Sequence, residues 1–594
     1  MLNGLLVDLA SSIEYPASLI MKRFVFLVIA AALAAFAILY GLHWSQQTRH
    51  AAVSALLPRE TIFFAQVPDF KQTRDQWHHS DVYQLCHEPA VQDFLRKPLA
   101  TLPKRDATSQ TLEEIEQLDP KDAFFALTSI DNNNPRFVAG FRFRGSQDAA
   151  EAIVGKWRGK LLEKNPNVKR EKIAYQQHQI ETIAAAPFTL ATAYDGHWFF
   201  ASNDLTELKG LLDRADRRNK DRQSTLDADE IYHAAMAHMP SSYTLLFYLQ
   251  PKKIAEKLAS VRAAFGQQTP LPQPKMPSGF EQMRSVCGTT RFDNGKIHDV
   301  FFVGMPKLTQ NASLTQSSVR LGTKDTFFYL ATVLNLEKFA ALNQPGVGAP
   351  FAGWLQKLFD AATRNGVTID DWNAAFELEL GSLADWPATA RSPSLIATLP
   401  VKDPVRANKI LGALTPAIDE VSPWRKTEKD GVSYFFIPTP ASLFAITPTI
   451  ALSDRLLVAG LDSVSVEAAI KRGGSASELS NSQTYKAAAR LLPAPTDFFA
   501  YIDMPLLYSR LDAAMRPMLL MSAAFMPAIS DHVDVSKLPP SEIVTKHLSP
   551  IVSSQRYEGD GYVQESIGPI TLTQAAIGLG LPAIYWAIAH QRGH

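Results

Sequence analysis

The sequence predicts an α+β protein of two tandem duplicated domains, each a curved antiparallel sheet with helices on one face, preceded by an N-terminal transmembrane helix. Three observations predict this class. An uncharged apolar run lies near the start, ordered landmarks recur about 265 residues apart, and neighbouring strand-like segments are separated by short turns. Short turns force strands to pair antiparallel. Strands and helices that cluster instead of alternating are typical of α+β folds.

Composition limits the function classes. A chain of 594 residues exceeds what one hydrophobic core usually serves, so several domains are expected. Apolar residues make up 46% and charged residues 20%, which favours a folded, mostly soluble body over a disordered chain or a polytopic membrane protein. Acidic and basic residues balance at 59 each, so no net charge attracts a polyanion. We expect no nucleic-acid partner.

The apolar run is FVFLVIAAALAAFAILYGL, residues 24–42, which contains no charge. At about 1.5 Å per residue it spans about 28 Å, the hydrocarbon thickness of a bilayer. A cleaved signal peptide is the alternative, with Ala35-Phe36-Ala37 as a cleavage site, but the apolar run continues beyond it. We therefore predict a single-pass transmembrane helix at 24–44 that anchors the protein in the membrane.

The charges beside this run predict its orientation. Lys22 and Arg23 precede it and only Arg49 follows closely, which favours a cytoplasmic N-terminus. The segment 1–23 would be cytoplasmic, although Met21 is a more natural start than Met1. We predict an inner-membrane protein whose main body is periplasmic or extracytoplasmic.

One phrase occurs four times and divides the body of the chain. LLPRETIFFAQVPDF (56–70) and LGTKDTFFYLATVL (321–334) each open a long unit. MPSSYTLLFYLQP (239–251) and LLPAPTDFFAYIDMP (491–505) each follow a helical segment with a Tyr and a run of alanines. The prediction is a first repeat domain at 56–306, a linker at 307–320, a second repeat domain at 321–568 and an apolar tail at 569–594.

Other landmarks keep the same order in both halves. The segments 189–212 and 449–470 each have the pattern strand, tight turn, strand, helix, with Asp195-Gly196 as the first turn. The segments 289–304 and 554–568 each have the pattern of a hairpin, with Asn294-Gly295 as the first turn. Ordered landmarks of this kind indicate duplication of a whole fold.

Periodicity predicts further elements of the first domain. Good helix formers at helical spacing predict a helix over 147–163. Strands are expected at 61–67, 123–130, 137–144 and 243–250. The Thr-Phe-Phe core of the recurring phrase is expected to be a buried strand.

The first copy of the phrase also carries a family resemblance. Leu-Pro-x-x-Thr-x-Phe-Phe-x-x-Val-Pro-Asp (57–69) follows the anchor, and Val-Tyr-Gln-Leu (82–85) and Val-Gln-Asp-Phe-Leu (91–95) come next. This pattern resembles an uncharacterised family of membrane-anchored bacterial proteins, domain of unknown function family 3352. The resemblance covers most of the chain outside the anchor and the tail. It implies an envelope location and this architecture, and it lends no site residues.

The chain offers few candidates for chemistry. Walker, G-x-S-x-G, H-E-x-x-H and G-x-G-x-x-G patterns are absent from the sequence. The best metal candidate is the stretch His78, His79, Cys86, His87 and Glu88, but its spacing fits no closed zinc site. We therefore predict no catalytic, cofactor-binding or metal residues and no cofactor.

Titratable residues elsewhere have structural interpretations. His233 and His238 are five apart on a predicted helix, so they do not share a face. Carboxylates at two expected helix starts favour solvated caps. A mixed charge cluster favours a solvated helix end. The carboxylates are Glu113, Glu114 and Glu116 after Thr111, and Asp370 and Asp371 after Thr368; the cluster comprises Arg214, Arg217, Arg218, Lys220 and Arg222 with Asp213, Asp216 and Asp221.

Two cysteines and two apolar segments leave alternatives open. Cys86 and Cys287 either pair in an oxidising compartment or remain buried thiols. The methionine-rich segment 515–529 is expected to be a helix packed in the core, with an adaptable binding surface as the alternative. The tail 569–589 either packs on the second domain or inserts in the membrane.

Three functions follow in order of preference. The first is a non-catalytic, membrane-tethered envelope protein that binds another protein or an envelope component. The second is a carrier or chaperone that holds a lipid or an apolar chain in the concave sheet of each repeat. The third is a divergent hydrolase, which needs a nucleophile and a base within hydrogen-bond reach. The sequence predicts neither the ligand nor the oligomeric state.

Overall fold

The computed structural model describes residues 52–101, 113–118, 120–131, 134–163, 168–185, 188–216, 224–256, 282–308, 313–335, 360–418, 424–438, 446–473, 477–525 and 533–576. Contacts divide the chain into two compact units. Unit 1 comprises Met1–His78, Lys104–His233 and Ser242–Leu249, and unit 2 comprises His79–Pro103, Ala234–Ser241 and Gln250–His594. The predicted transmembrane segment 24–44 lies outside the described residues. Among the residues that are described, no helix is both long enough and apolar enough to cross a membrane.

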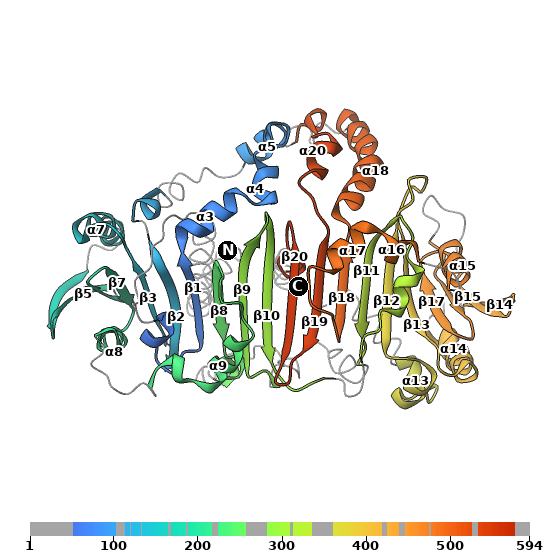
Figure 1. Ribbon diagram of the computed structural model, residues 1–594, viewed down its shortest axis with the longest axis horizontal. Coiled ribbons are helices and arrows are strands. Elements are labelled where there is room, and N and C mark those ends of the chain that lie inside the picture. Colours follow the sequence, from blue (N-terminus) through green and yellow to red (C-terminus); the bar gives the residue numbers. More distant parts are fainter. Residues whose placement is uncertain are drawn as a thin grey trace, which may run out of the picture. The chain divides into compact units, whose positions relative to one another are not determined.

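Unit 1 contains an antiparallel sheet (Figure 1). Its strands pair in the order β8 (Leu245–Leu249), β1 (Phe63–Asp69), β2 (Lys121–Asp131), β3 (Asn134–Arg142), β7 (Trp198–Ser202), β6 (Phe188–Asp195), β5 (His178–Ala185) and β4 (Lys169–Tyr175). The helical elements are η1 (Val53–Leu56), α3 (Phe70–His78), α7 (Gln147–Glu163), α8 (Leu205–Ala215), η3 (Leu226–Ala228) and the start of α9 (Glu230–Ala237).

Side chains of one parity form the core of this sheet. Phe64 pairs with Ala126 on one side and Tyr248 on the other, and all three side chains are fully buried. Because alternate residues of a strand point to opposite faces, Phe63 and its neighbours of the same parity lie on the other face. In the first copy of the phrase the strand buries Phe64 fully and Phe63 only partly, whereas Phe327 and Phe328 in the copy at 321–334 are both only partly buried.

Helices cover both faces of the outer strands in unit 1. The hydroxyl of Tyr194 donates to Glu151 of α7 across 2.9 Å, whereas α8 buries Leu208, Leu211 and Leu212 beside β3, β6 and β7. The prediction of helices on one face is therefore wrong for these strands. The physical reason is that adjacent residues such as Phe199 and Phe200 are both apolar, so both faces need cover.

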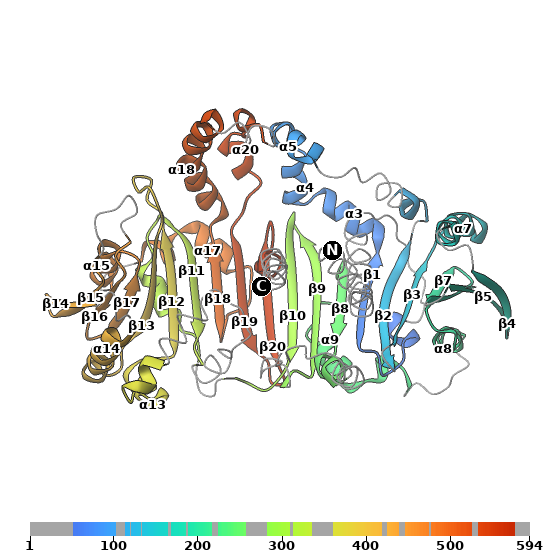
Figure 2. The ribbon, with the colours of Figure 1, turned by 180° about the vertical axis from the view of Figure 1, so that it is seen from behind.

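Unit 2 contains a second run of antiparallel strands, which lie side by side in Figures 1 and 2. They pair in the order β9 (Ser285–Asp293), β10 (Lys296–Gly304), β20 (Tyr562–Gly568), β19 (Ile551–Tyr557), β18 (Phe498–Ile502), β11 (Thr326–Val333), β12 (Glu379–Asp385), β13 (Ser394–Pro400), β17 (Leu456–Gly460), β16 (Thr449–Leu452), β15 (Val432–Phe436) and β14 (Arg425–Lys429).

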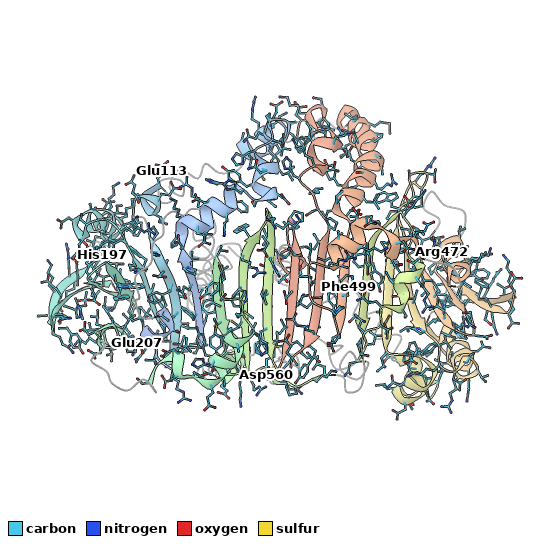
Figure 3. All side chains as sticks on the ribbon, in the orientation of Figure 1. Glu113, His197, Glu207, Arg472, Phe499 and Asp560 are labelled. Atoms are coloured by element: carbon cyan, nitrogen blue, oxygen red, sulfur yellow. The ribbon has the colours of Figure 1, made fainter. Side chains whose placement is uncertain are left out.

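The helical elements of unit 2 pack mainly at the strand ends and on the outer strands. They are α4 (Asp81–Cys86), α5 (Pro89–Thr101), η5 (Ser317–Leu321), α13 (Ile369–Ala375), α14 (Pro404–Ile418), α15 (Ser463–Arg472), α16 (Glu478–Asn481), α17 (Gln483–Ala489), α18 (Met504–Phe525), η6 (Val535–Lys537) and α20 (Ser541–Thr545). One core surrounds Tyr329, Phe499 and Tyr501, and Figure 3 labels Phe499 on its strand. A second core lies under α14 around Phe435, so helices again cover both faces of the outer strands.

Strand pairing follows one order in two stretches of the chain. β1 pairs with β2 and β8, β2 with β3 and β3 with β7, and β4 to β7 pair in succession. β11 pairs with β12 and β18, β12 with β13 and β13 with β17, and β14 to β17 pair in succession. The predicted α+β class is confirmed as a mixed fold with extensive antiparallel sheet.

The Asn294-Gly295 turn forms as predicted: the two residues join β9 to β10 with φ of 49° and 82°. Positive φ at both central residues gives the turn twist that matches antiparallel strands. The predicted Asp195-Gly196 turn is shifted by one residue, because Asp195 pairs with Trp198 and the central residues are Gly196, with φ of 56°, and His197. The segments 189–212 and 449–470 both fold as hairpin then helix. Helix α7 spans the predicted residues 147–163.

The expected linker 307–320 is partly anchored. The carboxylate of Glu379 on β12 accepts hydrogen bonds from Thr315, Gln316 and Ser317. Residues 309–312 lie outside the described part of the chain. The end of the segment is therefore held against the strands that follow it.

Candidate functional site

Two residues of the candidate metal stretch, His87 and Glu88, make contacts within unit 2. His87 stacks on Tyr83 with ring centroids 3.8 Å apart, and its Nδ1 lies 2.8 Å from the Tyr83 carbonyl oxygen. Glu88 accepts from His547 Nε2 at 2.6 Å and from Lys546 Nζ at 2.6 Å. Hydrogen bonds from Lys546 and His547 lower the pKa of Glu88. His87 and Glu88 therefore both have interaction partners within the protein.

Both cysteines are free thiols. Cys86 is exposed at the end of α4, whereas Cys287 is buried on β9. The Sγ atom of Cys287 lies 3.8 Å from the sulfur of Met236, and burial raises the pKa of the Cys287 thiol to about 12. The cysteines are therefore unpaired, and the expectation that the unpaired thiols are buried is correct for Cys287 and wrong for Cys86.

The carboxylates at the two expected helix starts differ. Thr368 and Asp371 form a capping box at the start of α13, as predicted. Glu114 is buried with 3% of its surface exposed, and accepts from Trp157 Nε1 at 2.7 Å and Lys156 Nζ at 3.1 Å. The expectation of a solvated Glu114 is wrong, because an indole donor on α7 stabilises the buried carboxylate. The same hydrogen bond lowers the pKa of Glu114.

The described part of the mixed charge cluster is also engaged. The Nε atom of Arg214 donates to the Leu56 carbonyl across 2.7 Å, and burial lowers the pKa of Arg214. The hydroxyl of Tyr175 donates to Asp213 at 2.9 Å. The solvated interpretation is wrong for Arg214 and Asp213. The remaining basic residues, Arg217, Arg218, Lys220 and Arg222, and Asp221 lie outside the described residues.

Unit 1 contains a group of metal-ligating side chains that the sequence analysis missed. His178, Asp195 and Asp216 each offer one ligand atom, and these atoms all lie within 4.8 Å of one another. His178 Nε2 lies 3.0 Å from Asp216 Oδ2, and each of these two side chains is only 4% exposed. Burial raises the pKa of Asp195, His178 opposes that shift and Asp216 adds to it. The sequence analysis named Asp195 in a predicted turn and Asp216 in the mixed charge cluster, but neither pattern indicated a metal site.

The two histidines of the α9 region have different environments. His233 is exposed, with its ring edge toward Tyr232. His238 Nδ1 lies 2.9 Å from Glu558, and its Nε2 lies 2.9 Å from Asp560. Figure 3 labels Asp560, which lies in the turn between β19 and β20. Because both ring nitrogens face carboxylates of this turn, the His238 side chain connects the turn to the chain segment that follows α9.

A second buried histidine lies on β10. His298 Nε2 is 3.1 Å from Glu565 on β20, and its Nδ1 is 2.9 Å from Asp293 on β9. Burial alone would lower the pKa of His298, but its hydrogen bonds to Glu565 and Asp293 raise it. The group links three adjacent strands. We interpret these hydrogen bonds as structural, because they connect neighbouring strands of the sheet.

Helix α18 carries an exposed apolar stripe. The side chains are Leu511, Met515, Met518 and Met521, which are 45%, 39%, 54% and 62% exposed. Their spacing places them on one side of the helix. The expectation that the methionine-rich segment 515–529 packs into the core is wrong for Met515, Met518 and Met521. We refer to these four side chains as the α18 stripe.

The sheet of unit 1 has a half-buried aromatic row. Phe63 on β1, Phe125 on β2 and Phe137 on β3 have ring centroids 6.3 Å and 5.8 Å apart in succession. They lie on the face opposite Phe64 and Tyr248. A partly exposed row of aromatic side chains can contact an apolar chain.

Comparisons with known proteins identify no family. No family model and no curated protein matches the chain. It is similar to crystal form III of TP0453 over 45% of this chain and 84% of TP0453, with 7% identity and a TM-score of 0.24. Crystal form I gives 45% and 83% coverage, 7% identity and a TM-score of 0.23. Form IV gives 42% and 79% coverage, 6% identity and 0.22. At these TM-scores the likeness carries no argument about fold or function.

Proposed function

We propose that this protein is a membrane-tethered envelope protein without catalytic activity, and that it binds a partner protein through the α18 stripe. The apolar residues 24–42 would serve as the tether. The exposed stripe is the observation that carries the proposal. The tandem-repeat body would act as the scaffold that carries α18.

The duplication of the body belongs to the same proposal. The repeated order of strand pairing supports it, as do the recurring hairpin and helix segments at 189–212 and 449–470. The compact units have a different boundary from the proposed domains 56–306 and 321–568, since β9 and β10 belong to unit 2. Membership of the domain of unknown function family 3352 remains part of this proposal.

Polar contacts fix the helix that carries the stripe. Arg510 donates to the Trp386 carbonyl at 2.8 Å and to Asp325 at 2.9 Å. Arg516 donates to the Pro539 carbonyl and to Asp512, each at 2.7 Å. A helix held in this way presents its apolar side chains at little entropic cost. Methionine side chains adapt their shape, which suits contact with an apolar protein surface.

A photo-crosslinking experiment tests the proposal. A photoreactive amino acid replaces Met518 in the full-length chain, and the products in intact cells are identified by mass spectrometry. We expect one recurrent partner protein. The triple change Met515→Gln, Met518→Gln, Met521→Gln should abolish co-purification of that partner in mild detergent.

A matched control separates the stripe from general surface hydrophobicity. Val405 and Val464 are 81% and 76% exposed and lie outside α18. The double change Val405→Gln, Val464→Gln should leave co-purification unchanged. Equal recovery of the partner by both variants would contradict the proposal. Membrane association is tested separately, by release of the full-length chain from washed membranes with detergent alone.

The carrier function is the second candidate, and the aromatic row of unit 1 favours it. A lipid chain lying along Phe63, Phe125 and Phe137 would bury the exposed parts of three rings, at roughly 25 cal/mol for each Å². Lipid analysis of the purified protein tests this. Co-purified lipid that is lost in Phe125→Ser but kept in the stripe variant would support a carrier.

A further inference from the structure

Three elements of unit 1 converge at the group formed by His178, Asp195 and Asp216. His178 is the first residue of β5, after the turn from β4. Asp195 is the last residue of β6, before the turn to β7. Asp216 is the C-cap of α8. Two hairpin turns and a helix end therefore bring three ligands, one histidine and two aspartates, together from separate positions in the sequence.

The strand register places these residues on one face. Ile180 pairs with Ala193, and each of the two strand ligands lies two residues from one member of that pair. Residues two apart in a strand point the same way, so His178 and Asp195 share a face. The helix α8 contacts β6 and β7, and its C-cap supplies the third ligand on that side.

The distances suit a small divalent ion. His178 Nε2 and Asp216 Oδ2 are 3.0 Å apart. Two ligand atoms bound to one tetrahedral zinc ion at its usual bond lengths are separated by roughly 3.3 Å. All the ligand atoms of the group lie within 4.8 Å of one another, so small side-chain rotations would close the set.

The surroundings support a cation. Gln177 Nε2 donates to Asp216 Oδ1 across 2.8 Å, which orients the carboxylate and leaves Oδ2 directed at His178. Outer hydrogen bonds of this type fix metal ligands in proteins. The C-terminal end of α8 adds the negative end of a helix dipole at the same place. An imidazole and two carboxylates are borderline and hard ligands, which suit divalent metals of the first transition row.

The same scaffold in unit 2 lacks the ligands. Val432 follows the β14–β15 turn as His178 follows the β4–β5 turn. Ser453 precedes the β16–β17 turn as Asp195 precedes the β6–β7 turn, and α15 ends at the C-cap Gly473. In unit 2 the two hairpins and α15 therefore assemble without a histidine or aspartate at the three corresponding positions. The fold alone does not account for the three ligands in unit 1.

We propose that His178, Asp195 and Asp216 form a divalent metal site that takes Zn²⁺, with a fourth position left for water or an external ligand. Through its three ligands the ion would crosslink the β4–β5 turn, the β6–β7 turn and the C-terminal end of α8. Three protein ligands with one open position are the pattern of zinc sites that accept an exogenous ligand. The site belongs to unit 1 and the α18 stripe to unit 2, and the metal proposal does not depend on the proposed partner binding.

Zinc titration of the full-length chain tests the proposal. The protein carries a tag without histidine, and Cys86→Ser removes the exposed thiol. Calorimetry against a competing chelator should give one high-affinity equivalent of Zn²⁺. Removing a ligand by Asp216→Asn should weaken that site by about 100-fold or more, and Gln177→Ala should weaken it by about tenfold.

Controls make the result specific. His233→Gln removes an exposed histidine outside the group and should leave the affinity unchanged. The double change His178→Val, Asp195→Ser installs the residues found at the same places in unit 2 and should abolish the site. Mg²⁺ should not compete, because it prefers six oxygen ligands.

Thermal unfolding of the Cys86→Ser protein tests zinc binding without any ligand variant, so the test does not depend on whether those variants fold. A bound ion stabilises the folded state by mass action, so saturating Zn²⁺ should raise the Tm of the Cys86→Ser protein. No rise in Tm, or binding by Asp216→Asn with unchanged stoichiometry and affinity, would overturn the proposal.

Discussion

His298 Nε2 lies 3.1 Å from Glu565 Oε2, although the two residues are 267 positions apart in the chain. Their strands β10 and β20 are antiparallel neighbours in which His298 pairs with Ile567 and Val300 pairs with Glu565. The two side chains therefore meet diagonally on one face of the sheet. This contact joins β10 to β20, which is the last strand in the described part of the chain.

The His298–Glu565 contact predicts a loss of stability as pH rises. The folded pKa of His298 is above its usual value, so the stabilisation is fully present below about pH 6.5 and is lost as pH rises through the folded pKa. Glu565 and Asp293 raise the pKa of the imidazole, and Arg291 lowers it. In urea unfolding of the full-length chain, the urea concentration at the midpoint should therefore fall as the pH rises above about 6.5.

The variant His298→Gln checks the assignment. Glutamine keeps a polar side chain but does not titrate, so the fall in the urea midpoint above pH 6.5 should disappear. His233→Gln is the matched control, because His233 is exposed and lies outside this group. A pH dependence that survives in His298→Gln would show that another group titrates.

The two cysteines should react at very different rates. Cys86 is exposed, whereas Cys287 is buried and the pKa of its thiol is raised to about 12. The thiolate is the reactive form, so a thiol reagent should modify one cysteine of the native protein quickly. Peptide mapping should locate that label at Cys86. Rapid labelling of both, or of neither, would contradict the free-thiol arrangement.

Local features of the fold were predictable from the sequence. Asn294-Gly295 specifies a turn with two positive φ angles, and the helix over 147–163 follows from residue type and spacing. Such signals act between near neighbours. The recurring order of elements was also visible, because hairpins and helices leave their own local patterns.

Contacts between distant residues were not predictable. Glu114 has the pattern of a solvated helix start, but Trp157 donates to it from 43 residues away. His178 and Asp216 meet only because two turns and the length of α8 bring them to one point. The methionines of α18 have the composition of a core helix, and only the packing of its neighbours decides that they are exposed.

Substitutions of two glycines in unit 1 test the packing of the sheet. A Cβ atom at Gly140 would lie 2.7 Å from the rings of both Phe124 and Phe200, which are buried. Gly140→Ala should lower the free energy of unfolding by about 1–3 kcal/mol, because the rings must shift. Gly159 lies in α7 with open space around it, so Gly159→Ala should raise stability by up to about 1 kcal/mol. Thermal melts that rank the two variants in the opposite order would refute this packing.

The carboxylate of Glu379 organises the segment before β11. It accepts from the backbone N–H groups of Thr315, Gln316 and Ser317 and from the hydroxyls of Thr315 and Ser317, at 2.6–3.0 Å. Glu379 is 7% exposed, so water replaces these bonds poorly when the side chain is removed. Glu379→Ala leaves buried donors unsatisfied and should cost about 2–3 kcal/mol.

Hydrogen exchange distinguishes this local role from a general loss of stability. In Glu379→Ala the amides of residues 315–317 should lose protection first, because their acceptor is gone. Glu379→Gln keeps one acceptor oxygen and should retain part of the protection. Glu377 supplies the control, because it lies two positions away and its carboxylate is half exposed beside Lys402. Glu377→Ala should leave the 315–317 amides protected, and equal deprotection by both alanine variants would place the effect in β12 instead of in the Glu379 carboxylate.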